Sequence, residues 1–136
     1  MPSTTHRAGS DRSRILIVDE RDVYRAACAA LLRTEGLEVI EVAPGGDVMG
    51  AALAFEPHVV LIDAATPAAR LRETTRRLRS LASAPTVVLI SSAGRERLEA
   101  CLADLPFLAK ADVCAREVLR ADLRATDELH SEPESE

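Results

Sequence analysis

Aromatic side chains are scarce in this sequence of 136 residues, which has no tryptophan, one tyrosine and two phenylalanines. So few rings argue against a surface on which bases or sugars stack. The hydrophobic residues, 47% of the total, are mainly Ala, Val, Leu and Ile, which suit helices packed on a sheet. No apolar stretch approaches the roughly 20 residues of a membrane-spanning helix. The sequence therefore predicts one domain with an aliphatic core and no contact with a membrane.

Secretion signals and cysteine motifs are also missing. Residues 1–13 lack the apolar segment of a signal peptide, so we expect a cytoplasmic protein. The three cysteines, Cys28, Cys101 and Cys114, are odd in number and form no C-x-x-C motif. We interpret them as small buried hydrophobic residues in a reducing compartment rather than as a disulfide or metal site.

The overall balance of charge does not favour binding to nucleic acid. The net charge of −5 arises in the C-terminal segment, which holds five of the 22 acidic residues and no Lys or Arg. Without those five acids, residues 1–126 have 17 acidic residues against 17 basic ones. We therefore expect no direct binding to nucleic acid.

Three short hydrophobic runs, at 15–18, 59–62 and 86–90, each end in polar side chains. Continuous β-branched runs of this length are typical of strands buried on both faces, as in a parallel sheet covered by helices. Ligands of such sheets bind beyond the carboxyl ends of the strands. The polar residues delivered to that edge are, in chain order, Asp19 and Glu20, Asp63, and Ser91 and Ser92.

Helix-like and strand-like segments alternate along the chain. We predict strands at about 14–19, 37–42, 59–63, 86–90 and 107–110, and helices at about 22–34, 47–55, 69–81, 95–103 and from 112 to 123 or beyond. Alternation of this kind indicates right-handed βαβ units. The predicted fold is α/β, a flavodoxin-like (βα)5 three-layer sandwich with a parallel sheet in the order 2-1-3-4-5. The predicted division is a disordered extension at 1–13, a folded domain at 14–125 and a disordered acidic tail at 126–136.

Two helices have faces that can be assigned from their spacing. In the helix at 22–34, the residues Val23, Ala27, Ala30 and Leu31 share one stripe, which we expect to face the core. In the helix at 69–81, we expect Leu71, Thr75 and Leu78 to face inward and the arginines to face outward. That Arg-rich face is either simply solvated or a docking surface for an acidic partner.

At the predicted switch point, Asp19, Glu20 and Asp63 would meet at the edge of the sheet. Three neighbouring carboxylates repel one another unless a hard cation compensates, and Mg²⁺ prefers oxygen ligands of this kind. Ser91 can donate a hydrogen bond, and Lys110, which is the only lysine, supplies a compact ammonium. Together these groups predict a site for a phosphoryl group. Singly, each has an ordinary reading as a helix cap, a turn residue or a surface charge.

The combined pattern resembles the receiver domain of two-component response regulators. The matching segments are Ile15–Glu20, Pro57–Asp63, the Pro67 four residues after Asp63, Thr75–Arg79, Val87–Ser91 and Phe107–Lys110. The resemblance covers residues 14–125, and it implies a stand-alone receiver rather than an enzyme.

The resemblance also implies roles for individual residues. Asp63 would accept a phosphoryl group from a sensor histidine kinase or a phosphotransfer protein. Mg²⁺ would be held by Asp19, Glu20, Asp63 and the Ala65 carbonyl. Ser91 and Lys110 would bind the phosphoryl group, and Phe107 would turn inward with Ser91 as the switch. The output would pass to a downstream protein effector, or through a homodimer formed by the helix at 95–103, the strand at 107–110 and the helix that follows.

Departures from the family pattern support a second hypothesis. Glu20 stands where an Asp is usual, and the loop after Asp63 lacks glycine. These changes fit a degenerate receiver that binds a partner without being phosphorylated. An enzyme on a similar sheet is the least favoured alternative, because Ala65 replaces the second acid of a D-x-D-x-T phosphatase motif, and Gly45-Gly46 lacks the Lys of a phosphate-binding loop.

Overall fold

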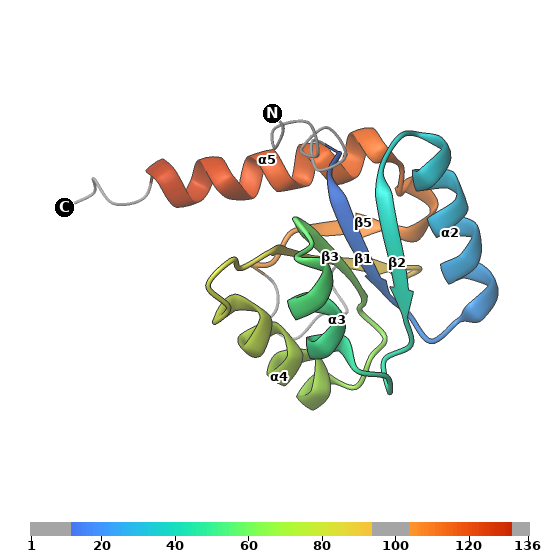
Figure 1. Cartoon of the computed structure of the whole chain (residues 1–136), viewed down its shortest axis with the longest axis horizontal. Helices are drawn as coiled ribbons and strands as arrows, with labels where there is room; N and C mark the ends of the chain where they lie inside the picture. The colour runs from blue at the N-terminus through green and yellow to red at the C-terminus, as the bar shows by residue number, and fades with distance from the viewer. Residues whose placement is uncertain (1–11, 94–103, 132–136) are drawn as a thin grey trace.

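In the computed structural model, which describes residues 12–93 and 104–131, five parallel strands form one sheet in the order β2-β1-β3-β4-β5 (Figure 1). The predicted fold class and strand order are confirmed. The strands are β1 (Arg14–Val18), β2 (Glu38–Val42), β3 (Val59–Asp63), β4 (Thr86–Ser91) and β5 (Phe107–Ala109). β1 and β3 are neighbours at the centre, with Val18 opposite Ile62, so the residues that follow these two positions come out side by side.

Helices cover both faces of the sheet, as Figure 1 shows. The helices are α2 (Asp22–Thr34), α3 (Val48–Phe55), α4 (Ala68–Arg79) and α5 (Ala115–Ser131). Side chains of α2 and α5 join one apolar cluster with alternate strand residues, and side chains of α3 and α4 join a second cluster on the other face. Each strand therefore buries both of its faces, as its continuous hydrophobic run requires. The helix predicted at 95–103 lies outside the described residues.

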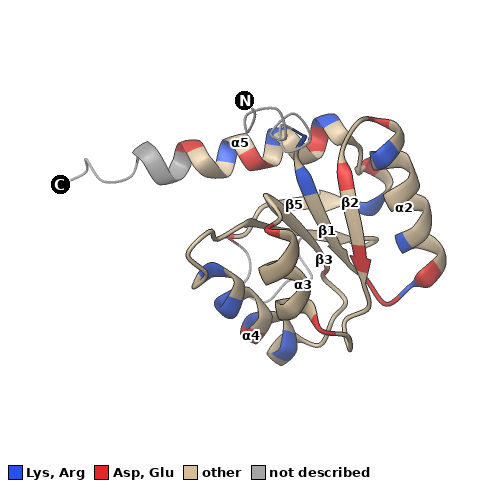
Figure 2. Ribbon diagram, viewed as in Figure 1, with Lys and Arg blue, Asp and Glu red and all other residues tan. Residues whose placement is uncertain are grey.

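The buried face of α2 differs from the predicted one. Val23 is 85% exposed and Leu31 43% exposed, while Cys28, Ala29 and Leu32 face the core. The helix is rich in alanine, so apolar residues at helical spacing occur on more than one face, and the spacing alone did not distinguish them. For α4 the prediction is confirmed, because Leu71, Thr75 and Leu78 are buried. Its arginines are exposed, and Figure 2 shows this basic charge beside α3, which has no charged residue.

Helix ends follow local chemistry in several places. The Asp47 side chain accepts a hydrogen bond from the Gly50 N–H and caps α3. Gly36, with φ of 98°, follows the end of α2 in the left-handed conformation that glycine adopts readily. Arg21 occupies the N-cap position of α2 without a side-chain hydrogen bond, and Asp22 is the first helical residue.

The last helix continues into the segment that was predicted to be a disordered tail. α5 runs to Ser131, so residues 126–131, which were assigned to a disordered tail, continue the helix. No proline or glycine follows Ala115 until Pro133, and nothing in the sequence interrupts the helix before Ser131. The Thr86 hydroxyl donates to Asp122 Oδ1 at 2.6 Å and fastens α5 to β4. Among the described residues, no helix is long and apolar enough to cross a membrane.

Candidate functional site

Two buried carboxylates lie at the carboxyl edge of the sheet. Asp63 ends β3, and Asp19 follows β1, the strand beside it. Asp19 has no exposed surface, and Asp63 is 3% exposed. Burial of two like charges this close to each other needs compensation from hydrogen-bond donors or a cation.

Backbone N–H groups supply the first part of that compensation. Asp19 Oδ1 accepts from the N–H of Arg21 at 2.8 Å, and Asp63 Oδ1 accepts from the N–H of Ala65 at 3.0 Å. Each contact joins a carboxylate to the amide two residues later, the turn that Asp favours after a strand. One oxygen of each carboxylate is thereby held, and the orientation of the other oxygen follows.

Lys110 supplies the cation. Its Nζ lies 2.7 Å from Asp19 Oδ2 and 3.5 Å from Asp63 Oδ2, and its side chain is 10% exposed. Lys110 directly follows β5 and begins the 3-10 turn Lys110–Asp112, so its side chain reaches back across the edge of the sheet. The structure thus brings together Asp19, Asp63 and Lys110 from three separate strand ends, as the sequence predicted.

Glu20 does not join this group. It is exposed, and among residues 12–93 and 104–131 no set of three or more His, Cys, Asp or Glu side chains is grouped in a way that could hold a metal ion. The expected cluster of three carboxylates is therefore not formed, because the chain turns toward solvent after Asp19. The predicted ligand Ala65, two residues after Asp63, is also exposed.

The carboxylate oxygens of Asp19 and Asp63 nevertheless meet part of what a hard cation requires. Asp19 Oδ2 is buried and accepts no well-aligned hydrogen bond from the described residues, although Lys110 Nζ is 2.7 Å away. Mg²⁺ is commonly held by one or two carboxylates, with waters completing its octahedron. Asp19 and Asp63 fit that requirement, and Glu20 in its present position does not.

Ser91 and Phe107 occupy neighbouring positions on the last two strands. Ser91, 8% exposed, ends β4 one position beyond Ile90, the residue opposite Asp63. Its hydroxyl accepts from the Ala93 N–H at 2.9 Å. Phe107 lies opposite Leu89, two positions before Ser91, so the three share one face of the sheet.

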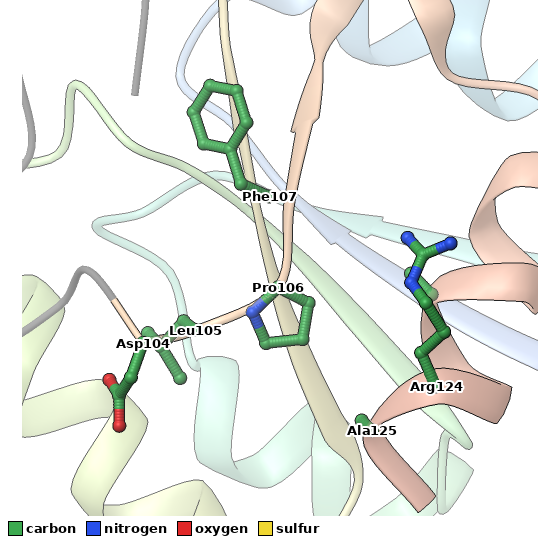
Figure 3. Close-up of a pocket in the computed structure, with 7 residues that line it drawn as sticks. Asp104, Leu105, Pro106, Phe107, Arg124 and Ala125 are labelled. Carbon is green, nitrogen blue, oxygen red and sulfur yellow. The ribbon is translucent and has the colours of Figure 1, made fainter. Parts of the chain in front are cut away.

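Phe107 is partly buried against the cluster that contains α3 and α4. It also lines a hollow of about 200 Å³ between the start of β5 and α5, which Figure 3 shows together with Pro106 and Arg124. The two predicted switch residues, Ser91 and Phe107, therefore lie on the same face of the sheet, the one that α3 and α4 cover.

Sequence reasoning missed two residues of α2 that contact the site. The Arg25 guanidinium donates to the carbonyl of Asp19 and to Glu41 Oε1 at 3.3 Å, and so secures the chain just after β1. Tyr24 lies against Lys110, with the lysine Nζ 4.7 Å from the ring centroid. The sequence did contain a signal for Tyr24: it is the only tyrosine, and it stands four residues after Glu20, about one helical turn beyond the acidic pair that follows β1.

The neighbours of Tyr24 keep its hydroxyl protonated. Burial raises the pKa of Tyr24 well above its usual range, and the Cys28 thiol and the charges of Asp19 and Asp63 raise it further. Burial likewise raises the pKa of the Cys28 thiol. Cys28 is 6% exposed, in keeping with its predicted part as a small core residue.

Solved receiver structures match this fold over most of the chain. A CheY-like response regulator receiver domain from Methylobacillus flagellatus is 20% identical, with a TM-score of 0.66 over 84% of this chain and 98% of that one. A response regulator from Desulfuromonas acetoxidans is 25% identical, with a TM-score of 0.60 over 86% and 98%. The pseudo-receiver domain of the CikA protein also matches, at 18% identity and a TM-score of 0.61 over 83% and 95%.

A curated relative matches in sequence. The chain is 38% identical over 85 residues to protein-glutamate methylesterase/protein-glutamine glutaminase 5 of Myxococcus xanthus (strain DK1622). The match covers 61% of this chain and spans about a quarter of that protein, 24% of its length. No protein-family model matches. The strand order and the matches to solved receivers over most of the chain together show that it has the fold of a response-regulator receiver domain.

Proposed function

We propose that this chain is a cytoplasmic receiver that accepts a phosphoryl group on Asp63 from a phosphohistidine of a sensor histidine kinase or phosphotransfer protein. The reaction depends on Mg²⁺, and the phosphorylated form signals to a downstream protein effector through a conformational switch. The chain has no enzymatic turnover of its own beyond this transfer. It binds neither nucleic acid nor membrane directly.

One observation carries the proposal: Asp19 Oδ2 and Asp63 Oδ2 both face the Lys110 ammonium, while both Oδ1 atoms are held by backbone amides. Phosphoryl transfer asks a protein mainly for positioning and neutralisation of charge. Here Asp63 is held by the hydrogen bond from the Ala65 N–H, and the Lys110 ammonium lies next to Asp63 Oδ2, the oxygen that would attack.

In the transfer, Asp63 Oδ2 attacks the phosphorus, the P–N bond of the phosphohistidine breaks, and a P–O bond to the carboxylate forms. The electron pair of the broken bond stays on the imidazole, which leaves as the neutral ring when the donor begins as the imidazolium. Lys110 remains beside the new acyl phosphate and offsets its added charge of about −1.5 to −2.

Mg²⁺, when bound, neutralises charge on the phosphoryl oxygens. Asp19 and Asp63 are the proposed ligands from the buried site, with the Ala65 carbonyl as a third. Glu20 is the proposed fourth ligand and must turn inward from its exposed position to reach the ion.

The proposed switch begins at Ser91. Its hydroxyl leaves the Ala93 N–H and donates to the phosphoryl group, and Phe107 follows on the same face of the sheet. The surface that would respond includes β5, α5 and the helix expected at 95–103, and it is the proposed contact for an effector or for a second copy of the chain.

The proposal is tested by incubating the protein with phosphoramidate and Mg²⁺ and measuring its intact mass. We expect a gain of one phosphoryl group in the unmodified chain and none in Asp63→Asn, which keeps the shape of the side chain. Lability of the added group to hydroxylamine identifies an acyl phosphate. A gain that persists in Asp63→Asn, or no gain in the unmodified chain, contradicts the proposal.

The second candidate is a degenerate receiver that binds its partner without phosphorylation. The exposed Glu20 favours it, as does the Lys110 ammonium, which lies 2.7 Å and 3.5 Å from the two carboxylates and compensates their charge. The structural match to a pseudo-receiver domain is in keeping with it. A melting temperature that Mg²⁺ raises in the unmodified chain but not in Asp63→Ala contradicts this candidate.

A further inference from the structure

One aromatic side chain contacts both ends of Lys110. The Tyr24 hydroxyl donates to the Lys110 carbonyl oxygen at 3.3 Å, and the Lys110 Nζ lies 4.7 Å from the centroid of the Tyr24 ring. Tyr24 stands in the first turns of α2, whereas Lys110 follows β5, 86 positions later in the sequence. The contact therefore joins the first helix of the described chain to the last strand.

The chemistry of Tyr24 suits this contact at both points. The hydroxyl stays protonated among its buried and acidic neighbours, so it acts as the donor to the carbonyl. The face of the ring carries partial negative charge and attracts the ammonium. Tyr24 is itself held in place, because it packs against the apolar cluster formed by α2, α5 and the sheet.

The Lys110 side chain has freedom of movement that its neighbours must restrict. Its four-carbon stem is flexible, and its ammonium is strongly hydrated and tends to turn toward water. The turn at Lys110–Asp112 is short and follows a strand of three residues, Phe107–Ala109. Tyr24 covers one side of the lysine, while Asp19 and Asp63 lie on another.

We propose that Tyr24 is a positioning residue for the phosphoryl-acceptor site, which holds the Lys110 ammonium against Asp19 Oδ2 and Asp63 Oδ2 before the phosphoryl donor arrives. The consequence for the reaction rests on the proposed function of Asp63. Because the ammonium is already in position, the transfer step does not have to order a mobile side chain. The ring carries most of the effect, because a hydrogen bond of 3.3 Å is long.

The test uses Tyr24→Phe, which keeps the ring, and Tyr24→Leu, which removes it. Val23→Ala, at an 85% exposed position one residue earlier, is the matched control on the same helix. Because Lys110 is the only lysine, isotope-labelled lysine gives one side-chain NMR signal for the site. We expect a ring-current shift of that signal in the unmodified chain, in Tyr24→Phe and in the control, and its loss in Tyr24→Leu.

The second measurement is the rate of phosphorylation by phosphoramidate at saturating Mg²⁺. Loss of a cation–π contact predicts a rate roughly 2- to 30-fold lower in Tyr24→Leu, with Tyr24→Phe within about twofold of the unmodified chain. Urea unfolding of each variant shows that the protein is folded under the assay conditions. A Tyr24→Leu protein that is folded and phosphorylated at the unmodified rate overturns the inference.

The two measurements separate this inference from the proposed function. If the unmodified chain is not phosphorylated at all, the proposed function fails, and the lysine signal still reports whether Tyr24 positions Lys110. A lysine signal that is the same in Tyr24→Leu and the unmodified chain overturns the positioning role, whether or not Asp63 is phosphorylated.

Discussion

Lys110 lies nearer to Asp19 than to Asp63: its Nζ is 2.7 Å from Asp19 Oδ2 and 3.5 Å from Asp63 Oδ2. The shorter ion pair is thus made with the carboxylate that is not proposed to react. Asp63 Oδ2 is less tightly engaged, which leaves it more accessible to an incoming phosphorus atom.

Removal of the lysine should expose the repulsion between the two acids. In Lys110→Gln, two buried carboxylates lose their shared cation, and we expect the free energy of unfolding to fall by about 3 kcal/mol. Arg120→Gln is the control, because its pair with Glu117 is half exposed and should contribute under about 1 kcal/mol. Urea unfolding measures both. Equal losses in the two variants would show that Lys110 does not compensate Asp19 and Asp63.

Magnesium should partly replace the missing cation. We expect Mg²⁺ to stabilise Lys110→Gln more than the unmodified chain, since the variant offers the ion two uncompensated carboxylates. The measurement is the change in melting temperature with increasing Mg²⁺. Ca²⁺, which prefers larger and more flexible sites, is the comparison ion.

Glu20 should determine how tightly Mg²⁺ binds. If Glu20 turns inward as the proposed ligand, Glu20→Gln should weaken binding and Glu20→Asp should strengthen it, each by an order of about tenfold. Tyr24 provides the readout, because the chain has one tyrosine and no tryptophan and Tyr24 contacts Lys110 at the site. Identical titrations of tyrosine fluorescence for all three proteins would remove Glu20 from the ligand set.

His58, at the opposite edge of the sheet, should make stability depend on pH. Its Nδ1 accepts the Arg14 N–H at 2.9 Å. Burial, followed by the charge of Arg14, lowers the pKa of His58 below its usual 6.5, while Asp122 and Glu38 oppose the shift. The unfolded chain therefore takes up the proton first as the pH falls. The contribution of the neutral His58 ring to the free energy of unfolding is fully present above about pH 6.5. It is lost as the pH falls through the pKa that His58 has in the folded protein, which is the lower of the two.

The corresponding measurement is urea unfolding at about pH 7.5 and about pH 5.5. His58→Gln, which does not titrate, should lose less stability between the two values than the unmodified chain. The difference is expected to be small, because the burial of His58 is only partial and much of the residue is exposed to solvent. An equal loss in both proteins would assign the pH dependence to other groups.

Glu56 is the other residue at this edge with a testable conformation. It ends α3 with φ of 52°, in the left-handed region that L-residues with side chains adopt at a cost. Glu56→Gly should raise the free energy of unfolding by about 0.5 kcal/mol. Glycine relieves the backbone strain of the folded state, and the greater conformational freedom of the unfolded chain offsets part of that gain. Glu56→Ala keeps the strain and controls for the lost carboxylate. If thermal unfolding shows that Glu56→Ala and Glu56→Gly are equally stable, this explanation is contradicted.

The sheet and the core of the site could be predicted because both follow from where polar residues stand in the sequence. Asp19, Asp63 and Lys110 each directly follow or end a hydrophobic run, and parallel strands bring such positions to one edge. Glu20 follows Asp19 directly, yet its side chain points to solvent. Adjacent residues diverge where a strand ends, and sequence order does not say which of the two faces the site.

The contacts across elements were harder to predict. Tyr24 reaches Lys110 only because α2 packs with Cys28, Ala29 and Leu32 inward, and the alanine-rich sequence allowed another face to be chosen. The end of α5 was misplaced for a different reason: acidic and polar composition indicated disorder, although the residues up to Ser131 are compatible with a helix.

The order of the strands also has a consequence for how the chain reaches this structure. β1 pairs with β2 and with β3, and β3 pairs with β4, in each case in parallel, so none of these pairs can begin as a hairpin. Arg14 and His58, 44 positions apart, lie in contact at the start of the pairing between β1 and β3. Contacts so distant in sequence slow folding, because closing a long loop costs conformational entropy before the contacts form and stabilise the chain. The two acids of the site therefore depend on such a distant contact, because the pairing of β1 with β3 is what brings them together.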